Sequence, residues 1–332
     1  MHTMKETFFL LLSTSPIWLL ILSFLGFFTI LWHSATVARW VYRAFLRPSK
    51  DLRYYGSWGI VTGATDGIGK SFAYQLARAG LNLVLVSRSS MKLKAVSKDI
   101  QSEFPDTKVK IIELDFTEDD ISGGIAEIEE VIEDLDVGIL INNVGITYPN
   151  ASFFHEVDEK VWMNVFKVNV KGTTWVTKAV LPKMIKKNRG AIVNIGSGAA
   201  VIVPSHPLYA IYAATKAYVD QLSRSLHVEY KDWGIDVQCQ VPLYVATEMA
   251  SRVASVSQAS LFIPSADDYV KAAIRQIGYE PRCTPYWAHS LQWCFASLLP
   301  EAMLDAWRLS IGLERRRKES VTMKRIEGCK QE

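Results

Sequence analysis

The chain contains 332 residues, of which 49% are hydrophobic and 11% aromatic, and its 37 Lys and Arg against 34 Asp and Glu leave a net charge of +3. This length is enough for a large buried core, and the many aromatic residues exclude an intrinsically disordered chain. The near balance of charge argues against a dedicated nucleic-acid-binding protein, which usually carries a large basic excess. The four cysteines form no Cys-x-x-Cys pair. We therefore expect reduced thiols, and neither a disulfide framework nor a metal site.

The first element in chain order is an apolar segment over residues 8–32, which carries no charged side chain. As a helix it is long enough to cross a hydrocarbon core of about 30 Å, so we predict an N-terminal membrane anchor. A cleavable signal peptide would have a shorter apolar region and a small-residue cleavage site, for which Ser34-Ala35-Thr36 is a poor match. A buried core helix is disfavoured because the segment lacks an amphipathic pattern.

The cations that flank this segment predict its orientation. Before it the only basic side chain, His aside, is Lys5, whereas after it come Arg39, Arg43, Arg47, Lys50 and Arg53. The positive-inside rule then places the bulk of the chain in the cytosol. The sequon Asn150-Ala151-Ser152 should accordingly stay unglycosylated.

From residue 57 onward, short runs rich in Val and Ile alternate with longer amphipathic stretches. Several of the runs are apolar on both faces, as parallel strands covered by helices require. Strands are predicted over 57–62, 81–86, 109–114, 137–142, 190–195 and 235–241, with helices over 70–79, 118–134 and 159–186, among others. Strand–helix alternation of this kind predicts an α/β fold, a doubly wound parallel sheet of the Rossmann type. A single domain over residues 52–280 is the simplest organisation, because no linker or internal repeat interrupts it.

A glycine-rich loop, Thr62-Gly63-Ala64-Thr65-Asp66-Gly67-Ile68-Gly69-Lys70, lies between the first predicted strand and the first predicted helix. Glycines permit a tight turn and let backbone N–H groups approach a pyrophosphate, and the helix N-terminus favours that anion. The spacing Gly-x-x-x-Gly-x-Gly is weak evidence alone, and an ordinary strand–helix turn is the alternative. Its position in the chain favours a dinucleotide site.

The second predicted strand ends at Val86-Ser87-Arg88. An acidic residue at this point would bind the ribose 2′-hydroxyl of NAD, whereas Ser87 and Arg88 suit a 2′-phosphate. NADP is therefore the favoured cofactor, although an ordinary surface arginine would give the same pattern.

Tyr212 and Lys216 form the only Tyr-x-x-x-Lys pair in the chain, and Ser197 lies 15 residues before Tyr212. A spacing of four places both side chains on one face of a helix. A free phenol has a pKa of about 10, which a nearby ammonium lowers. A Ser197 hydroxyl could then hold a carbonyl oxygen while Tyr212 supplies a proton. The alternative is an exposed helical pair that never meets substrate.

The C-terminal segment, residues 281–332, differs from the predicted domain. It contains an apolar stretch that includes Trp287, Trp293 and Phe295, followed by the basic run Arg315-Arg316-Arg317-Lys318. The apolar stretch is too short for a clean membrane span. It could lie on a membrane, line a hydrophobic tunnel or pack on the core as an ordinary helix. The basic run is either solvated or in contact with anionic lipid.

Together these motifs resemble the short-chain dehydrogenase/reductase family over nearly all of residues 52–280. The resemblance rests on the glycine loop, Asp115, Asn142-Asn143-Val144-Gly145, Asn169, Ser197 and Tyr212-x-x-x-Lys216. It implies a catalytic tetrad of Asn169, Ser197, Tyr212 and Lys216. It also implies a cofactor site composed of Gly63, Thr65, Asp66, Gly67, Ile68, Gly69, Ser87, Arg88, Asp115, Asn142, Tyr212, Lys216 and Thr247.

Within that family the chain is similar to the plant very-long-chain 3-oxoacyl-CoA reductases. The similarity rests on the N-terminal anchor and on residues 45–58, 135–143, 154–159, 227–249 and 278–290. It implies NADPH-dependent reduction of 3-oxoacyl-CoA to 3-hydroxyacyl-CoA at the endoplasmic reticulum membrane. It further implies work beside a condensing enzyme, a dehydratase and an enoyl reductase, with no nucleic acid partner. Family members often form homo-oligomers.

Two departures keep other functions open. Val144 stands where the wider family usually has alanine, and Pro242-Leu243 replaces its usual Pro-Gly. Extra volume at Val144 could weaken cofactor binding by overpacking. Val144 therefore leaves open a catalytically weak paralogue that serves as a structural elongase subunit. A membrane-bound hydroxysteroid dehydrogenase is the other alternative, because the fold and the tetrad are common to both enzymes and specificity lies in the region after Val241.

Overall fold

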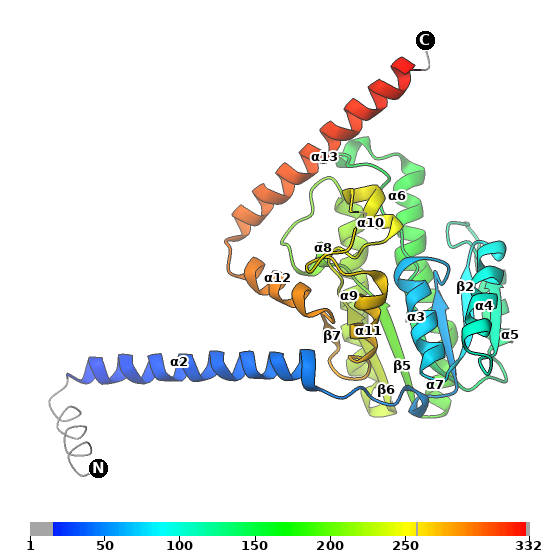
Figure 1. Ribbon diagram of the computed structural model, residues 1–332, viewed down its shortest axis with the longest axis horizontal. Helices are drawn as coiled ribbons and strands as arrows, with labels where there is room; N and C mark the ends of the chain where they lie inside the picture. The colour runs from blue at the N-terminus through cyan, green and yellow to red at the C-terminus, as the bar shows by residue number, and fades with distance from the viewer. Residues whose placement is uncertain (1–15, 257, 330–332) are drawn as a thin grey trace. The chain divides into compact units, whose positions relative to one another are not determined.

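The computed structural model describes residues 16–256 and 258–329, with side chains described as far as Lys318. The chain divides into two units, Met1–Pro48 and Ser49–Glu332. Figure 1 shows the elements of each unit.

The described part of the first unit forms one long helix, α2 (Ile17–Val41), which continues through the π-helical turn η1 (Tyr42–Leu46). Its 30 residues have a mean hydropathy of 1.8 over the most apolar window, none of which is buried. Within the described residues it is the only helix long and apolar enough to cross a membrane, since 30 helical residues extend about 45 Å. The predicted anchor, 8–32, begins outside the described residues, and the helix continues past its predicted end.

The second unit contains a seven-stranded parallel sheet of order β3-β2-β1-β4-β5-β6-β7. The strands are β1 (Trp58–Thr62), β2 (Asn82–Ser87), β3 (Val109–Glu113), β4 (Val137–Asn142), β5 (Gly190–Ile195), β6 (Ile235–Gln240) and β7 (Arg282–Cys283). This order reverses direction between β1 and β4, the switch point at which doubly wound sheets bind their ligands. The predicted fold class is confirmed, and six of the strands lie within a residue or two of their predicted bounds. The two-residue β7 was not predicted.

Hydrophobic cores lie on both faces of the sheet. Helices α3 (Gly67–Arg78), α4 (Ser90–Glu103) and α11 (Ala266–Ile274) contribute to one core, and α5 (Ser122–Val131) and α7 (Thr173–Lys186) contribute to the other. Alternate residues of a strand enter opposite cores: in β4, Ile139 and Ile141 join the first and Leu140 the second. This alternation explains why the strands are apolar on both faces.

The predicted helix over 159–186 is interrupted. It comprises α6 (Glu159–Phe166), the π-helical turn η4 (Lys167–Gly172) and α7. Turns of this kind occur frequently at functional sites. Here the turn carries Asn169, which is buried.

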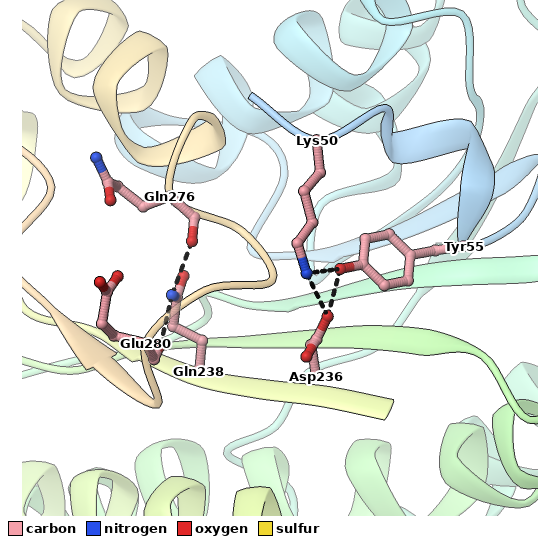
Figure 2. A network of polar contacts seen from close by, with 6 residues as sticks. All are labelled: Lys50, Tyr55, Asp236, Gln238, Gln276 and Glu280. Carbon is pink, nitrogen blue, oxygen red and sulfur yellow. Dashed lines mark hydrogen bonds and ion pairs between the residues drawn. The ribbon is translucent and has the colours of Figure 1, made fainter. Parts of the chain in front are cut away.

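Polar side chains attach two loops to β6 (Figure 2). Lys50 Nζ lies 3.2 Å from Asp236 Oδ2, and the buried Tyr55 hydroxyl donates to the same carboxylate. Gln238 Nε2 donates to the carbonyl oxygens of Gln276 and Glu280, at 2.9 and 2.7 Å. Buried amides and phenols need hydrogen-bond partners. These bonds therefore hold in place the segment before β1 and the loop before β7.

The remaining described α-helices are α8 (Gly198–Val201), α9 (Ala210–Tyr230), α10 (Glu248–Ala254), α12 (Trp287–Ser297) and α13 (Glu301–Cys329). Short 3-10 helices lie at Leu52–Tyr54, Phe154–Glu156 and Lys231–Trp233. Helices α12 and α13 form the predicted C-terminal segment, and both bury part of their surface: His289, Leu304 and Arg308 are all under 9% exposed. Phe295 and Leu298 are instead 68% and 74% exposed. The segment therefore packs on the core through one side, while contact of the other side with a membrane stays a prediction.

Candidate active site

The glycine loop turns tightly between β1 and α3. Gly63 and Gly67 have φ of 64° and 50°, a region that favours glycine. A Cβ on Gly69 would lie 2.2 Å from the Gly63 carbonyl oxygen, so only glycine allows this close approach. The Asp66 carboxylate caps α3 by accepting from the Gly67 N–H at 2.6 Å.

The first turn of α3 leaves backbone donors available. Within the described residues, no acceptor pairs with the N–H groups of Ile68 and Gly69, and Gly69 is buried. Unpaired N–H groups at a helix N-terminus suit a phosphate. These residues therefore fit the pyrophosphate of a dinucleotide.

The side chain of Asn143 braces the glycine loop from β4. Its Nδ2 donates to the carbonyl oxygens of Thr62 and Gly63, at 3.0 and 3.2 Å. The backbone N–H groups of Asn143 and Val144 both donate to Thr62 Oγ1. Val144 is half-buried against the core on the α5 and α7 side of the sheet. That its larger side chain weakens cofactor binding stays a prediction.

Asn142, in contrast, directs its side chain into the protein. Its Nδ2 donates to Thr177 Oγ1 and Asn194 Oδ1, both at 2.8 Å, and the residue is 3% exposed. The role assigned to Asn142 in cofactor binding stays a prediction, and its amide donors are committed to these interior bonds.

The end of β2 places Ser87 beside the glycine loop. Ser87 Oγ lies 3.0 Å from Thr65 Oγ1, so these two predicted cofactor residues meet. Arg88 is exposed and, within the described part of the chain, makes no ion pair. A free guanidinium next to these hydroxyls fits a 2′-phosphate.

Two other predicted cofactor residues border this region. Asp115 follows β3 and accepts from the Thr117 N–H at 2.9 Å. Thr247 caps α10, and its methyl lies 3.0 Å from a Cβ built on Gly67. The segment after β6 therefore lies against the glycine loop.

The four predicted catalytic residues lie on neighbouring elements. Asn169 Oδ1 accepts from the Ile146 N–H, and its Nδ2 donates to the Ile146 carbonyl oxygen, both at 2.9 Å. Lys216 Nζ donates to the Ile195 carbonyl oxygen at 2.8 Å. A Cβ on Gly145 would lie 3.2 Å from Lys216 Nζ and 3.4 Å from Asn169 Oδ1. The two side chains therefore approach the same point, which glycine leaves open.

Ser197 and Tyr212 complete the group. Ser197 caps α8, and Tyr212 lies on α9 four residues before Lys216. Burial raises the pKa of Tyr212, a hydrogen bond with Ser197 opposes this shift, and the nearby Tyr244 phenol adds to it. Burial also lowers the pKa of Lys216 to about 8.

These shifts differ from the expectation that the ammonium of Lys216 lowers the pKa of Tyr212. In this structure the pKa of Tyr212 is raised, because burial dominates and Lys216 is directed at the Ile195 carbonyl oxygen. With a pKa of about 8, Lys216 still holds most of its positive charge at pH 7. The predicted roles of Ser197 in holding a carbonyl oxygen and of Tyr212 in supplying a proton stay predictions.

Residues beyond β6 add a second group, which no sequence motif assigns to the site. The buried His289 of α12 accepts from the Leu243 N–H at 3.3 Å through Nδ1, and its Nε2 lies 3.1 Å from the Tyr244 carbonyl oxygen. Burial lowers the pKa of His289 to about 4. The ring is therefore neutral near pH 7, with the hydrogen on Nε2.

Helix α13 contributes two arginines to this second group. Arg315 Nη2 donates to the Tyr244 hydroxyl at 2.8 Å, and Arg308 Nη2 lies 2.7 Å from His206 Nδ1. Burial lowers the pKa of His206 to about 3, helped by the charge of Arg308. Burial raises the pKa of Tyr244, but the charges of Arg315 and Arg308 outweigh it, so that this pKa is lowered overall. Side chains remote in sequence thus converge on Tyr244, and no motif predicts them.

Comparison with known proteins gives matches over most of the chain. A sequence model of the short chain dehydrogenase family matches residues 58–257. An Arabidopsis thaliana protein named very-long-chain 3-oxoacyl-CoA reductase-like protein is 58% identical over 92% of this chain and 97% of its own length. A human inactive hydroxysteroid dehydrogenase-like protein 1 is 39% identical over 82% of this chain and 80% of its own. A rat very-long-chain 3-oxoacyl-CoA reductase is 40% identical over 74% of this chain and 76% of its own length.

Among solved structures, a short-chain dehydrogenase from Sphingobium yanoikuyae in complex with NADPH matches with a TM-score of 0.58. It is 32% identical, and the match covers 66% of this chain and 83% of that one. The sheet order, the glycine loop and the sequence match agree. The chain therefore belongs to the short-chain dehydrogenase/reductase family of NAD(P)-dependent oxidoreductases.

Proposed function

We propose that the protein reduces very-long-chain 3-oxoacyl-CoA to 3-hydroxyacyl-CoA with NADPH, in the first reduction of the fatty-acid elongation cycle. The observation that carries the proposal is the convergence of Asn169, Ser197, Tyr212 and Lys216 beside the glycine loop. The names of the Arabidopsis and rat relatives support the substrate class. The complete tetrad favours an active reductase over a solely structural elongase subunit.

The proposed cofactor site extends along the carboxyl ends of β1 and β2. The free N–H groups of Ile68 and Gly69 would bind the pyrophosphate, and Thr65, Ser87 and Arg88 the 2′-phosphate. Around them, Gly63, Asp66 and Gly67 shape the loop. Asp115 would border the adenine side, and Thr247 and Lys216 the nicotinamide side. When bound, NADPH supplies a hydride to the carbonyl carbon.

The residues of the chain control the proton. Ser197 donates a hydrogen bond to the carbonyl oxygen of the substrate, and Tyr212 delivers the proton that this oxygen takes up. The raised pKa keeps Tyr212 protonated before the reaction. Lys216 and Asn169 support this transfer, Lys216 by charge and Asn169 by holding the backbone at Ile146 in place.

We further propose that α2 anchors the protein in the endoplasmic reticulum membrane, with the catalytic unit in the cytosol. The exposed apolar surface of α2 and the cations that follow it support this arrangement. Very long acyl chains partition into lipid, so an anchored reductase meets its substrate at the membrane. A condensing enzyme, a dehydratase and an enoyl reductase would be its partners.

The orientation has a direct test. Asn150 is exposed within its Asn-x-Ser sequon, so a lumenal domain would be accessible to glycosylation. After translation into microsomes, we expect the protein to run at one mass with and without glycosidase. As a control, the same sequon appended before the anchor should be glycosylated. A glycosidase-sensitive shift that Asn150→Gln abolishes would contradict the cytosolic assignment.

The cofactor preference has a second test, the substitution Arg88→Gln. Loss of one charge-assisted contact to a 2′-phosphate should weaken NADPH binding about tenfold, or 1.4 kcal/mol. Affinity for NADH, which lacks this phosphate, should be unchanged. Cofactor titration by fluorescence measures both, with the exposed Lys94→Gln of α4 as control. Equal affinity of parent and variant for NADPH would show that Arg88 does not bind the 2′-phosphate.

The reaction itself is tested with detergent-solubilised full-length protein. We expect NADPH oxidation with a long-chain 3-oxoacyl-CoA and formation of the 3-hydroxyacyl product. Faster turnover of hydroxysteroid or ketosteroid substrates would favour the alternative dehydrogenase. A folded protein that binds NADPH but turns over neither substrate would favour the structural elongase subunit.

A further inference from the structure

Tyr244 is held at both its backbone and its side chain. Its carbonyl oxygen meets the buried His289, and its hydroxyl accepts from Arg315. Two residues earlier, the Pro242 carbonyl oxygen accepts from the Gly198 N–H at 2.8 Å. The segment that carries Tyr244 is thus bonded directly to the residue after Ser197, at the substrate end of the tetrad.

The arginines around Tyr244 are not neutralised by acids. Within the described side chains neither Arg308 nor Arg315 pairs with a carboxylate, although Arg308 is only 8% exposed. Its buried Nε has no hydrogen-bond partner. Unpaired charge of this kind is costly to bury. An electronegative group from outside the chain would offset that cost.

The hydrogen of the Tyr244 hydroxyl is available for such a group. A phenol oxygen accepts and also donates one hydrogen bond. Arg315 occupies the acceptor side at 2.8 Å, which leaves the O–H to donate. None of the described side chains accepts this hydrogen. The positive charge of the neighbouring guanidinium makes the O–H a stronger donor.

We propose that Tyr244 donates a hydrogen bond to the thioester carbonyl oxygen of the substrate, with Arg315 as the residue that positions its hydroxyl. The inference rests on the proposed function, because a 3-oxoacyl-CoA has two carbonyl groups separated by one methylene. Ser197 and Tyr212 engage the oxygen of the ketone. Tyr244, which lies close enough to influence Tyr212, meets the second oxygen, so a 3-oxo thioester is selected over a simple ketone.

The test compares two substrates of equal chain length. One is the 3-oxoacyl-CoA, and the other is the matching 3-oxoalkyl-CoA thioether, in which a methylene replaces the thioester carbonyl. We expect Tyr244→Phe to lower the ratio of kcat/KM for the thioester to kcat/KM for the thioether about 10- to 100-fold. The exposed Tyr54→Phe serves as the control for phenol removal.

Arg315 provides a second, independent variant. Arg315→Met should lower the same thioester-to-thioether ratio, Arg315→Lys should restore part of it, and the exposed Arg317→Met of the same helix should leave it unchanged. These variants keep the test available if Tyr244→Phe fails to fold, which thermal unfolding would reveal.

The outcomes separate this inference from the proposed function. A ratio that stays at the parental value in Tyr244→Phe or Arg315→Met would overturn the inference while the reductase activity stands. Equal losses on both substrates would also overturn it, because the hydroxyl would then serve the fold or the shared chemistry. A parent protein that fails to reduce the thioester would contradict the proposed function before any variant is measured.

Discussion

Replacement of Tyr212 with phenylalanine is expected to lower kcat for 3-oxoacyl-CoA reduction by about 10³-fold. The substitution removes the only phenol that is paired with Ser197 in the described site, and loss of a positioned general acid costs about 10²- to 10⁴-fold. The ring remains, so packing on α9 should be preserved. Single-turnover measurement of NADPH oxidation separates this loss of the chemical step from a slow product release.

Binding measurements distinguish the chemical role from a structural one. The affinity of Tyr212→Phe for NADPH should stay within a few-fold of the parent, because the glycine loop, Ser87 and Arg88 are unchanged. Tyr218→Phe is a matched control on the same helix, since Tyr218 is exposed and its hydroxyl lies 2.8 Å from Thr174 Oγ1. A Tyr212→Phe protein that retains parental turnover would contradict the assignment of Tyr212 as proton donor.

The substitution Gly69→Ala is expected to have the largest effect on the cofactor site. The added Cβ would lie 2.2 Å from the Gly63 carbonyl oxygen and 2.3 Å from Asn143 Nδ2. The first of these atoms is backbone, and the second holds the loop by donating to Thr62 and Gly63. The clash should therefore open the turn, cost about 1–3 kcal/mol of folding free energy and lower Tm by roughly 3–10 °C.

The same change should reduce NADPH affinity by more than tenfold, because the N–H groups of Ile68 and Gly69 would no longer face a common point. Thermal unfolding with and without NADPH measures both effects, since a ligand that binds only the folded state raises Tm. Gly123→Ala on α5 is the matched control. Its Cβ meets no atom within 4 Å, and alanine favours a helix by up to about 1 kcal/mol. A Gly69→Ala protein with the Tm and affinity of the parent would contradict this account of the loop.

The human inactive relative shows that a protein of similar sequence can carry a name that denotes loss of activity. A fold alone does not establish activity, which depends on particular side chains. All four predicted tetrad residues are present in this chain, and the contacts of His289 and Arg315 hold Tyr244 in place. Kinetics of the Tyr212 and Tyr244 variants would show whether these side chains act together in catalysis.

Much of the architecture was determined by the sequence alone. Runs of Val and Ile between amphipathic stretches predicted six of the strands, because a parallel strand covered on both faces must be apolar throughout. The glycine loop was predictable for a similar local reason, since a close turn before a helix tolerates few other residues. The tetrad was predicted from the family resemblance, with Tyr212 and Lys216 also indicated by their spacing, and the structure places the four residues on adjoining elements.

Only the tertiary structure decided which side chains are committed elsewhere. Asn142 donates to Thr177 and Asn194 within the protein. Lys216 is directed at the Ile195 carbonyl oxygen, so burial rather than its charge dominates the pKa of Tyr212. The π-helical turn at Asn169 and the convergence of His289, Arg308 and Arg315 around Tyr244 were also absent from any local pattern. Spacing along a helix or strand determines which face a residue occupies, whereas hydrogen-bond partners and desolvation depend on segments far apart in the chain, and only folding brings those segments together.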